Sequence, residues 1–308
     1  MRVPRTASHR SSPPVPLAPS RRELAAALLP RPRPAGLPER VVEASGVRTD
    51  RAHLDAWARV STPRPGVPLP TSLPAAYLHV LAGGASMRLL LDPAFPLPLL
   101  GLVHVGQRLE LRREVDPREP LDLAVRAQDL RPHRRGRQLD VVASASVAGE
   151  EVWRGVSTYL HREGSSSGGS GELPGGSGGS GGSGEPRREL PAGSVRWVVP
   201  TSTGRAYARV SGDPNPIHLS RPTARLLGFR RPIAHGMWTL ARALGDLEGR
   251  LPAAHVVSAR FLRPLAMPGH AVCGWGPLEG APDGSLLLAV RRERDGEPHL
   301  VAEVTPAT

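Results

Sequence analysis

Lysine is absent from this chain of 308 residues, so its 40 basic side chains are all arginines. Their excess over 28 acidic residues gives a net charge of +12, and basic surfaces of this kind can bind nucleic-acid phosphates. The arginines are scattered through every segment, however, and aromatic residues make up only 4%, too few for base-stacking platforms. We therefore predict no nucleic-acid site, and interpret the charge as solvated surface that also favours an anionic partner.

Cysteine and long apolar runs are the other shortages. Cys273 is the single cysteine, which excludes an intrachain disulfide and a cysteine-based metal cluster. The sequence has no apolar run of about 18 residues, as a membrane-spanning helix would need. Residues 1–20 are basic and rich in proline, but they lack the apolar core of a signal peptide. The expected protein is cytoplasmic, with no membrane span.

Glycine and proline are abundant instead, with 34 and 35 copies, and they indicate which parts are not core. Residues 1–37 alternate proline, arginine and serine and are predicted to form a disordered basic tail. Residues 164–186 are almost wholly glycine and serine, which predicts a flexible linker. The remaining residues, 38–163 and 187–308, form two units that are each long enough to bury a core.

The two units show the same order of elements. Each begins with a short strand and an amphipathic helix, continues with an apolar helix, and ends in four segments whose apolar residues recur at a period of two. We therefore predict an α+β fold in which each unit wraps an antiparallel sheet around a central helix. The expected helices are Asp50–Val60, Ala75–Leu91, Thr201–Val210, a short one begun by Ser220 and Pro222 and ended by Gly228, and Gly236–Leu247.

One stretch, YARVSGDPNPIHLSRPTARLLGFRRPIAHGM at 207–237, carries the chemistry. Asp213 and His218 lie five residues apart on a turn that glycine and two prolines make rigid. A carboxylate and an imidazole held to a common point could bind one water or hydroxyl between a proton acceptor and a proton donor. Gly236 opens the following helix, where an unpaired backbone N–H could stabilise a developing oxyanion.

The pattern Y-A-x-x-S-G-D-x-N-P-[LIV]-H, followed by P-I-x-H-G-M, resembles the hydratase motif of the MaoC-like family. Its members are (R)-specific enoyl hydratases and 3-hydroxyacyl-thioester dehydratases of the hotdog fold. The resemblance implies a hydro-lyase of fatty-acid metabolism that acts on CoA or acyl-carrier-protein thioesters without an organic cofactor or metal. It also implies that Asp213 and His218 are the catalytic pair and that Gly236 supplies the oxyanion N–H.

The two units align with each other as repeats. The segment from Trp57 to Ser61 matches that from Tyr207 to Ser211, and Tyr77-Leu78-His79 matches Ile233-Ala234-His235. In the ungapped register the first unit places Pro63 and Pro68 where the second has Asp213 and His218, so only the second repeat keeps the pair. This resembles the double-hotdog dehydratases, with an internal pseudo-dimer whose degenerate half makes room for the acyl chain. A further homodimer is compatible with it.

Each candidate residue also has a structural interpretation. Asp213 could only close an Asx turn, although that would not explain a histidine five residues later. Asn215 either orients the loop or touches the substrate, and Gly236 could simply allow close helix packing. His235 is expected to anchor the backbone. Arg263 either borders the substrate tunnel or is a surface arginine.

Three further points stay open or negative. Tyr207 is expected to pack in the core with its hydroxyl satisfied nearby, and Cys273 to behave as a small buried hydrophobe. Asp213 with His218 could ligate a metal, but His235 is the only other ligand nearby. The alternative function is a non-catalytic acyl-thioester-binding protein of a lipid pathway, and the pattern does not say which of Asp213 and His218 is the acid.

Overall fold

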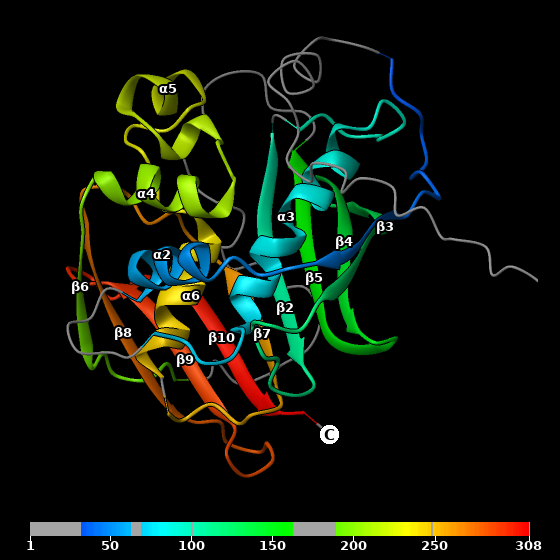
Figure 1. Ribbon diagram of the computed structural model, residues 1–308. Helices are drawn as coiled ribbons and strands as arrows, with labels where there is room; N and C mark the ends of the chain where they lie inside the picture. The colour runs from blue at the N-terminus through cyan, green and yellow to red at the C-terminus, as the bar shows by residue number, and fades with distance from the viewer. Residues whose placement is uncertain (1–31, 63–68, 100, 163–188, 248, 308) are drawn as a thin grey trace, which may run out of the picture.

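The computed structural model describes residues 32–62, 69–99, 101–162, 189–247 and 249–307. The described strands form one antiparallel sheet of ten, in the order β1-β3-β4-β5-β2-β7-β10-β9-β8-β6 (Figure 1). The N-terminal half contains β1 (Val42–Val47), α2 (Arg51–Ser61), α3 (Ala75–Leu91), β2 (Leu102–Leu111), β3 (Leu121–His133), β4 (Gly136–Val147) and β5 (Glu150–Arg162). The C-terminal half contains β6 (Val195–Val199), α4 (Ser202–Ser211), the 3₁₀ turn η1 (Pro216–His218), α5 (Arg221–Leu226), α6 (Gly236–Asp246), β7 (His255–Phe261), β8 (Gly269–Pro277), β9 (Leu286–Arg292) and β10 (Pro298–Pro306).

Local sequence signals account for the helix boundaries. Asp50 caps α2 by accepting a hydrogen bond from the N–H of Ala52, and Ser220 caps α5 by accepting one from Thr223. The apolar helix α3 has the predicted bounds, and most of its side chains are buried. In α2, Leu54 and Trp57 face the core as predicted, whereas Val60 is only partly buried and the neighbouring Ser61 is fully buried.

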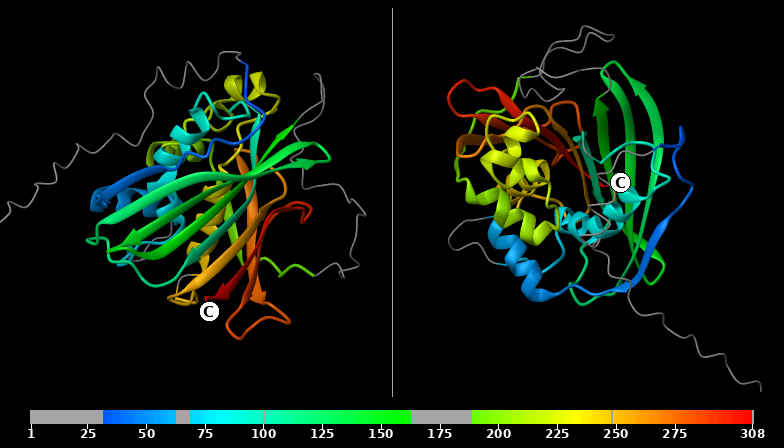
Figure 2. Two further views of the ribbon diagram at one scale, coloured as in Figure 1. Left: turned by 90° about the vertical axis from the view of Figure 1, so that its right-hand side faces the viewer. Right: turned by 90° about the horizontal axis from the view of Figure 1, so that it is seen from above.

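The two halves are continuous with each other. Strand β2 pairs with β7 from Gly106↔Arg260 to Leu111↔His255, so the half-sheets join into one. The sheet curves around the helices, with α3 against β3 and β4 and α6 against β9 and β10 (Figure 2). Helix α2 packs on α4 and α6 of the other half, and one hydrophobic cluster includes residues of both halves. The predicted double hotdog is therefore confirmed, and its repeats share a core.

The chain before β1 is partly fixed to the fold. The Arg33 guanidinium donates to the carbonyls of Phe95 and Leu97 at 3.1 and 2.9 Å, and Leu37 packs against the core. Both residues fall in the predicted tail, so contact with the fold begins before residue 38. The rest of that tail, the predicted linker and the positions of Pro63 and Pro68 lie outside the described residues. The proposed domain boundaries and the degenerate loop thus stay predictions.

Within the described residues, no helix combines the length and the apolarity that crossing a membrane requires.

Candidate active site

The loop after α4 is shaped by its own side chains. Gly212 ends the helix in the left-handed region, with φ of 70°, which glycine adopts without strain. Asp213 Oδ1 then accepts the N–H of Asn215 at 3.0 Å, and Asn215 Oδ1 accepts that of Ile217 at 3.3 Å. These bonds use one oxygen of each side chain, which leaves Oδ2 of Asp213 for another role. Asn215 therefore orients the loop, and only its amide NH₂ remains for a substrate.

The second of these bonds starts a turn that the sequence did not predict. Residues Pro216–His218 form η1, with Asn215 as its N-cap and Pro216 in its first position. The predicted non-helical turn accordingly ends at Asn215. The 3₁₀ turn brings His218 back beneath α4, where only 7% of the histidine is exposed.

The position and tautomer of His218 are set by Ile233. Its Nδ1 lies 2.7 Å from the carbonyl oxygen of Ile233, which can only accept a hydrogen bond. The proton is therefore on Nδ1, and Nε2 of the neutral ring carries a lone pair. The N–H of Ile233 in turn donates to the carbonyl of Ile217, so the segments around His218 and Ile233 hold each other in place.

His235 closes the other side of the site. Its ring stacks on that of His218 with centroids 3.6 Å apart, and its Nε2 lies 3.3 Å from the backbone oxygen of Asp213 and 3.8 Å from Oδ2. Donation to the backbone oxygen ties α6 to the loop, as expected for an anchoring residue. The side chain of His235 is 4% exposed while that of Asp213 is 43% exposed, so the carboxylate is the accessible member.

Gly204 of α4 is a site residue that sequence reasoning missed. A Cβ at this position would collide with the carbonyl oxygen of His218 and lie 2.8 Å from Met267 Cε. Only glycine lets η1 pack this closely against α4. A single glycine in a helix gives no sign of this role, because its partner is fixed by tertiary packing.

Gly236 is the first residue of α6, and no side chain caps this helix. Its N–H has no intrahelical partner and carries the partial positive charge of the helix start. A Cβ here would lie 3.0 to 3.2 Å from the ring of Phe261, which is closer than most side chains tolerate. Gly236 therefore allows close packing against Phe261, and its oxyanion role stays a prediction.

The electrostatics favour an ionised carboxylate beside a neutral imidazole. Although part of the Asp213 side chain is exposed, desolvation by the surrounding protein disfavours its charge. The positive charge that His235 and His218 carry when protonated, together with the N–H of Asn215, outweighs this and lowers the pKa of the carboxyl. Burial lowers the pKa of His218, partly opposed by the Asp213 carboxylate. Burial and the neighbouring His218 lower the pKa of His235 to about 3. At neutral pH the three groups together carry one negative charge.

Residues of the N-terminal half also lie near Asp213, although the sequence did not single them out. Burial lowers the pKa of His79 in α3 to about 4 and that of His104 in β2 to about 3, and the charge of Asp213 opposes both shifts. The ring of Tyr159 in β5 stacks on that of His104, and the ring of Phe261 meets His104 edge-on. The ring centroids are 4.9 Å apart in both pairs. The alignment of His79 with His235 in the repeats was the one signal that could have indicated this cluster.

The other predicted residues lie as follows. Tyr207 is buried in the core and its ring lies 5.0 Å from that of His235, but its hydroxyl faces Trp57 and makes no hydrogen bond within the described residues. The predicted hydroxyl partner is therefore wrong. Cys273 is a free, fully buried thiol, as predicted.

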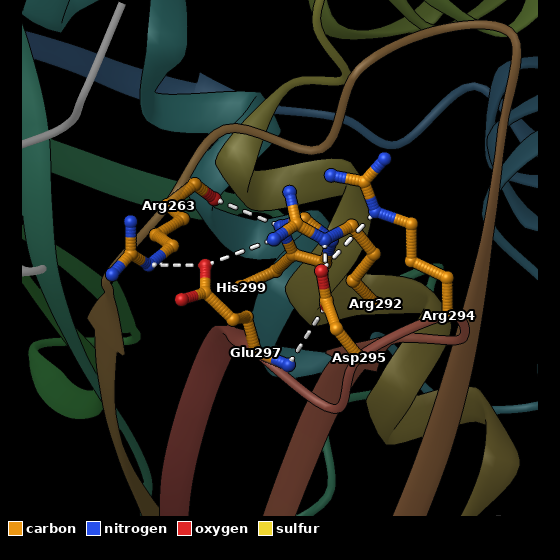
Figure 3. A network of polar contacts seen from close by, with 6 residues as sticks. All are labelled: Arg263, Arg292, Arg294, Asp295, Glu297 and His299. Atoms are coloured by element: carbon orange, nitrogen blue, oxygen red, sulfur yellow. Dashed lines mark hydrogen bonds and ion pairs between the residues drawn. The ribbon is translucent and has the colours of Figure 1, made fainter.

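Arg263 is partly buried and belongs to an ion-pair network, and whether it also borders a substrate tunnel stays a prediction. Its guanidinium pairs with Glu297 at 3.0 Å, and Glu297 also binds Arg292 at 3.0 Å (Figure 3). Arg292 and Arg294 bracket Asp295, and His299 lies against the backbone of Arg263. Figure 3 shows these six residues as one network at the β9–β10 turn, in which the Arg263 head group points to Glu297.

Asp213, His218 and His235 are the described residues that could hold a metal ion, because their ligand-type atoms lie within 4.8 Å of one another. Two of their ring nitrogens, however, already face backbone carbonyls: Nδ1 of His218 and Nε2 of His235. That a metal is not required stays a prediction.

A double hotdog with a carboxylate beside an imidazole and an uncapped helix start in its second repeat is typical of the hotdog dehydratases and hydratases. The family model described as "MaoC like domain" matches residues 188–270. The chain is 35% identical to the 3-hydroxyacyl-thioester dehydratase X of Mycobacterium tuberculosis over 92% of this chain and 95% of that protein. It belongs to the MaoC-like family.

Solved structures agree. The crystal structure of HtdX from M. tuberculosis superimposes with a TM-score of 0.71 and 31% identity, covering 87% of this chain and 100% of that one. A MaoC-like dehydratase from Phytophthora capsici shares the fold, with a TM-score of 0.64 and 17% identity over 88% of this chain and 96% of that one. The peroxisomal enoyl-CoA hydratase 2 of Arabidopsis thaliana is 39% identical, over 23% of this chain and 25% of that protein.

Proposed function

We propose that this protein catalyses the reversible dehydration of (R)-3-hydroxyacyl thioesters to trans-2-enoyl thioesters. The observation that carries the proposal is the neutral His218, whose Nδ1–H is engaged by Ile233 so that its Nε2 lone pair is available beside the Asp213 carboxylate. The relatives that are named as a 3-hydroxyacyl-thioester dehydratase and an enoyl-CoA hydratase support the same reaction.

The protonation states decide how the proton moves. Asp213 and His218 Nε2 both accept hydrogen bonds at neutral pH, so a water between them donates one hydrogen to each. In hydration, the C3–O bond forms while one of the two groups takes a proton from the water, and that proton then passes to C2. In dehydration the pair removes the proton from C2 and delivers it to the hydroxyl that leaves C3. Because neither group holds a spare proton, the proton taken from C2 is the one that reaches the hydroxyl leaving C3. The two bonds therefore break on the same face of the substrate, which is syn geometry.

Gly236 and Asn215 have supporting roles in this proposal. The N–H of Gly236 donates to the thioester carbonyl oxygen and stabilises the enolate-like charge that builds up when the C2 proton is removed. Asn215 holds the loop that aims Asp213, through its bond to Ile217. We expect the acyl chain to lie toward the N-terminal half. There His79 and Tyr159 are near enough to Asp213 for its charge to raise their pKa values.

Product analysis tests the reaction. The chain is incubated with crotonyl-CoA in D₂O, with and without prior dialysis against EDTA. We expect (R)-3-hydroxybutyryl-CoA that carries deuterium at C2 on the face of the new hydroxyl, at a rate that chelation leaves unchanged. Absence of turnover on thioesters of several chain lengths would instead indicate a non-catalytic acyl-thioester-binding protein, and an (S)-product would contradict the proposal.

The pH dependence follows from the neutral state of His218. A base must be unprotonated to act, and burial lowers the pKa of His218, so it stays unprotonated below the ordinary histidine value of about 6.5. We expect kcat/KM to be nearly constant from about pH 8 down to about pH 6.5 and to fall only in more acidic solution. An acid limb centred at or above about pH 7 would contradict this assignment.

The carrier, the location and the assembly are part of the proposal as well. CoA and acyl-carrier-protein thioesters are both accommodated by the chemistry above, which acts only on the acyl group. A cytoplasmic location rests on the single buried cysteine. The internal pseudo-dimer supplies both halves of the site, and a homodimer is compatible with it.

A further inference from the structure

The segment around the catalytic loop is strongly basic. Residues 201–235 contain a single acid, Asp213, whose carboxylate belongs to the site. The same residues contain six arginines, and all six are exposed: Arg205, Arg209, Arg221, Arg225, Arg230 and Arg231. We call the exposed face of α5 and its flanks, with Arg221, Arg225, Leu226 and Arg230, the α5 face.

Several arginines elsewhere pair with acids. Arg113 pairs with Glu119 at 2.9 Å, Arg154 with Glu151 at 2.7 Å and Arg292 with Asp295 at 2.7 Å, so such pairs occur in both halves. Within the part of the chain that the structure describes, Arg221, Arg225 and Arg230 make no hydrogen bond or ion pair. Arg221 and Arg225 are also one helical turn apart, where like charges disfavour a helix. The α5 face is therefore positive without any compensation from the fold.

An exposed apolar residue, Leu226, directly follows Arg225. Leu226 is 86% exposed, and it is the most exposed of the large hydrophobic residues described. The phosphates of a nucleotide would contact the arginines but gain nothing from an exposed leucine side chain. An exposed leucine with arginines nearby is, in contrast, typical of a protein interface with an apolar centre and a charged rim.

The α5 face is joined directly to the catalytic loop. Helix α5 begins three residues after His218 and packs against η1. Thr223 Oγ1 of α5 donates to the carbonyl of Pro216 at 2.7 Å. Figure 1 shows α5 beyond α4 at the outer end of the C-terminal half, with no other helix or strand covering it. A partner protein bound to the α5 face would hold the acyl group that it carries close to Asp213 and His218.

We infer that the α5 face docks an acidic acyl-carrier protein, which presents the acyl thioester to the site. This inference rests on the proposed function and deepens it, because it selects a protein-bound thioester over free CoA as the preferred form. Complementary charge would accelerate encounter with the carrier, and the effect would weaken as salt screens it.

The test compares one crotonyl group on three carriers: an acidic bacterial acyl-carrier protein, CoA and pantetheine. The full-length chain is compared with the double variant Arg221→Glu/Arg225→Glu, with Leu226→Ser, and with the control Arg126→Glu. Arg126 is an exposed arginine on β3 of the other half. We expect the double variant to raise KM for the carrier-bound substrate roughly tenfold with kcat unchanged. CoA and pantetheine substrates should change less than about twofold, and Arg126→Glu should change none of them.

Salt supplies a second readout on the unaltered chain. Raising salt from about 0.05 M to about 0.5 M should increase KM for the carrier-bound substrate more than for the pantetheine substrate. If the double variant raised KM for CoA as much as for the carrier protein, the arginines would bind nucleotide phosphates. If KM rose for none of the three substrates, the α5 face would bind no carrier. Either result would overturn the docking inference but leave the proposed function standing. Absence of turnover by the unaltered chain on all three carriers would refute the proposed function itself.

Discussion

Asp213→Asn and His218→Asn are each expected to lower kcat for crotonyl-CoA hydration by about 10²–10⁴ while the protein stays folded. Asparagine at 213 can still accept the N–H of Asn215, so the loop keeps its Asx turn and loses only the charge. Asparagine at 218 places an N–H near the position of Nδ1, which keeps the bond to Ile233 and removes the Nε2 base. The measurement is the loss of enoyl absorbance, with circular dichroism for folding.

His255→Asn is the matched control for this pair. His255 is also buried, and its Nδ1 makes the same kind of bond, to the carbonyl of Pro252 at 2.7 Å, but it lies on β7. We expect its kcat to change less than about twofold. The double variant at 213 and 218 should be no slower than the slower single variant, because the two groups act on one proton. Near-native kcat in His218→Asn would remove His218 from the mechanism.

Gly204→Ala is expected to cost about 1–3 kcal/mol of unfolding free energy and to lower kcat by about 10²-fold. The added methyl would collide with the carbonyl oxygen of His218 and crowd Met267. Backbone cannot yield as a flexible side chain does, so η1 must move and carry the His218 ring away from its bond to Ile233. Urea denaturation measures the first effect, and crotonyl-CoA kinetics the second.

Gly83→Ala provides the comparison for that variant. Gly83 also lies inside a helix, α3, but a Cβ there would find only the carbonyl oxygen of Ser211 at 3.7 Å, an ordinary contact. Alanine at 83 should leave kcat unchanged and stabilise the protein by about 0.5–1 kcal/mol, since glycine loses more backbone freedom on folding. If Gly204→Ala behaved like Gly83→Ala, close packing of η1 on α4 would not matter for the site.

Much of the fold follows from local sequence. Helix α3 has its predicted bounds because a mostly apolar segment follows Pro74, and α5 begins directly after Ser220 because that side chain caps it. The strands were expected from their period of two, and β5 (Glu150–Arg162) is one of them. These signals act over a few residues and are present in the chain before it folds.

The motif also predicted which chemical groups meet. Asp213 and His218 are separated by five residues on a constrained loop, so the sequence alone brings them close. What it left open was their division of labour. The structure adds one constraint, because the carbonyl of Ile233 fixes the proton on Nδ1 of His218 and makes Nε2 an acceptor. Which of the two groups takes the proton stays a prediction. Ile233 is 15 residues away from His218, and nothing in its identity suggests that its carbonyl would do this.

The remaining parts of the site come only from tertiary structure. His79, His104 and Tyr159 reach the neighbourhood of Asp213 because β2 pairs with β7 and joins the half-sheets. That register depends on packing between residues about 150 positions apart, which no local pattern encodes. The sequence by itself determined most of the elements, the repeats and the close approach of Asp213 and His218, since these depend on neighbouring residues. Tertiary structure decided the tautomer, the need for Gly204 and the approach of the N-terminal half to Asp213, because each depends on contacts between distant segments.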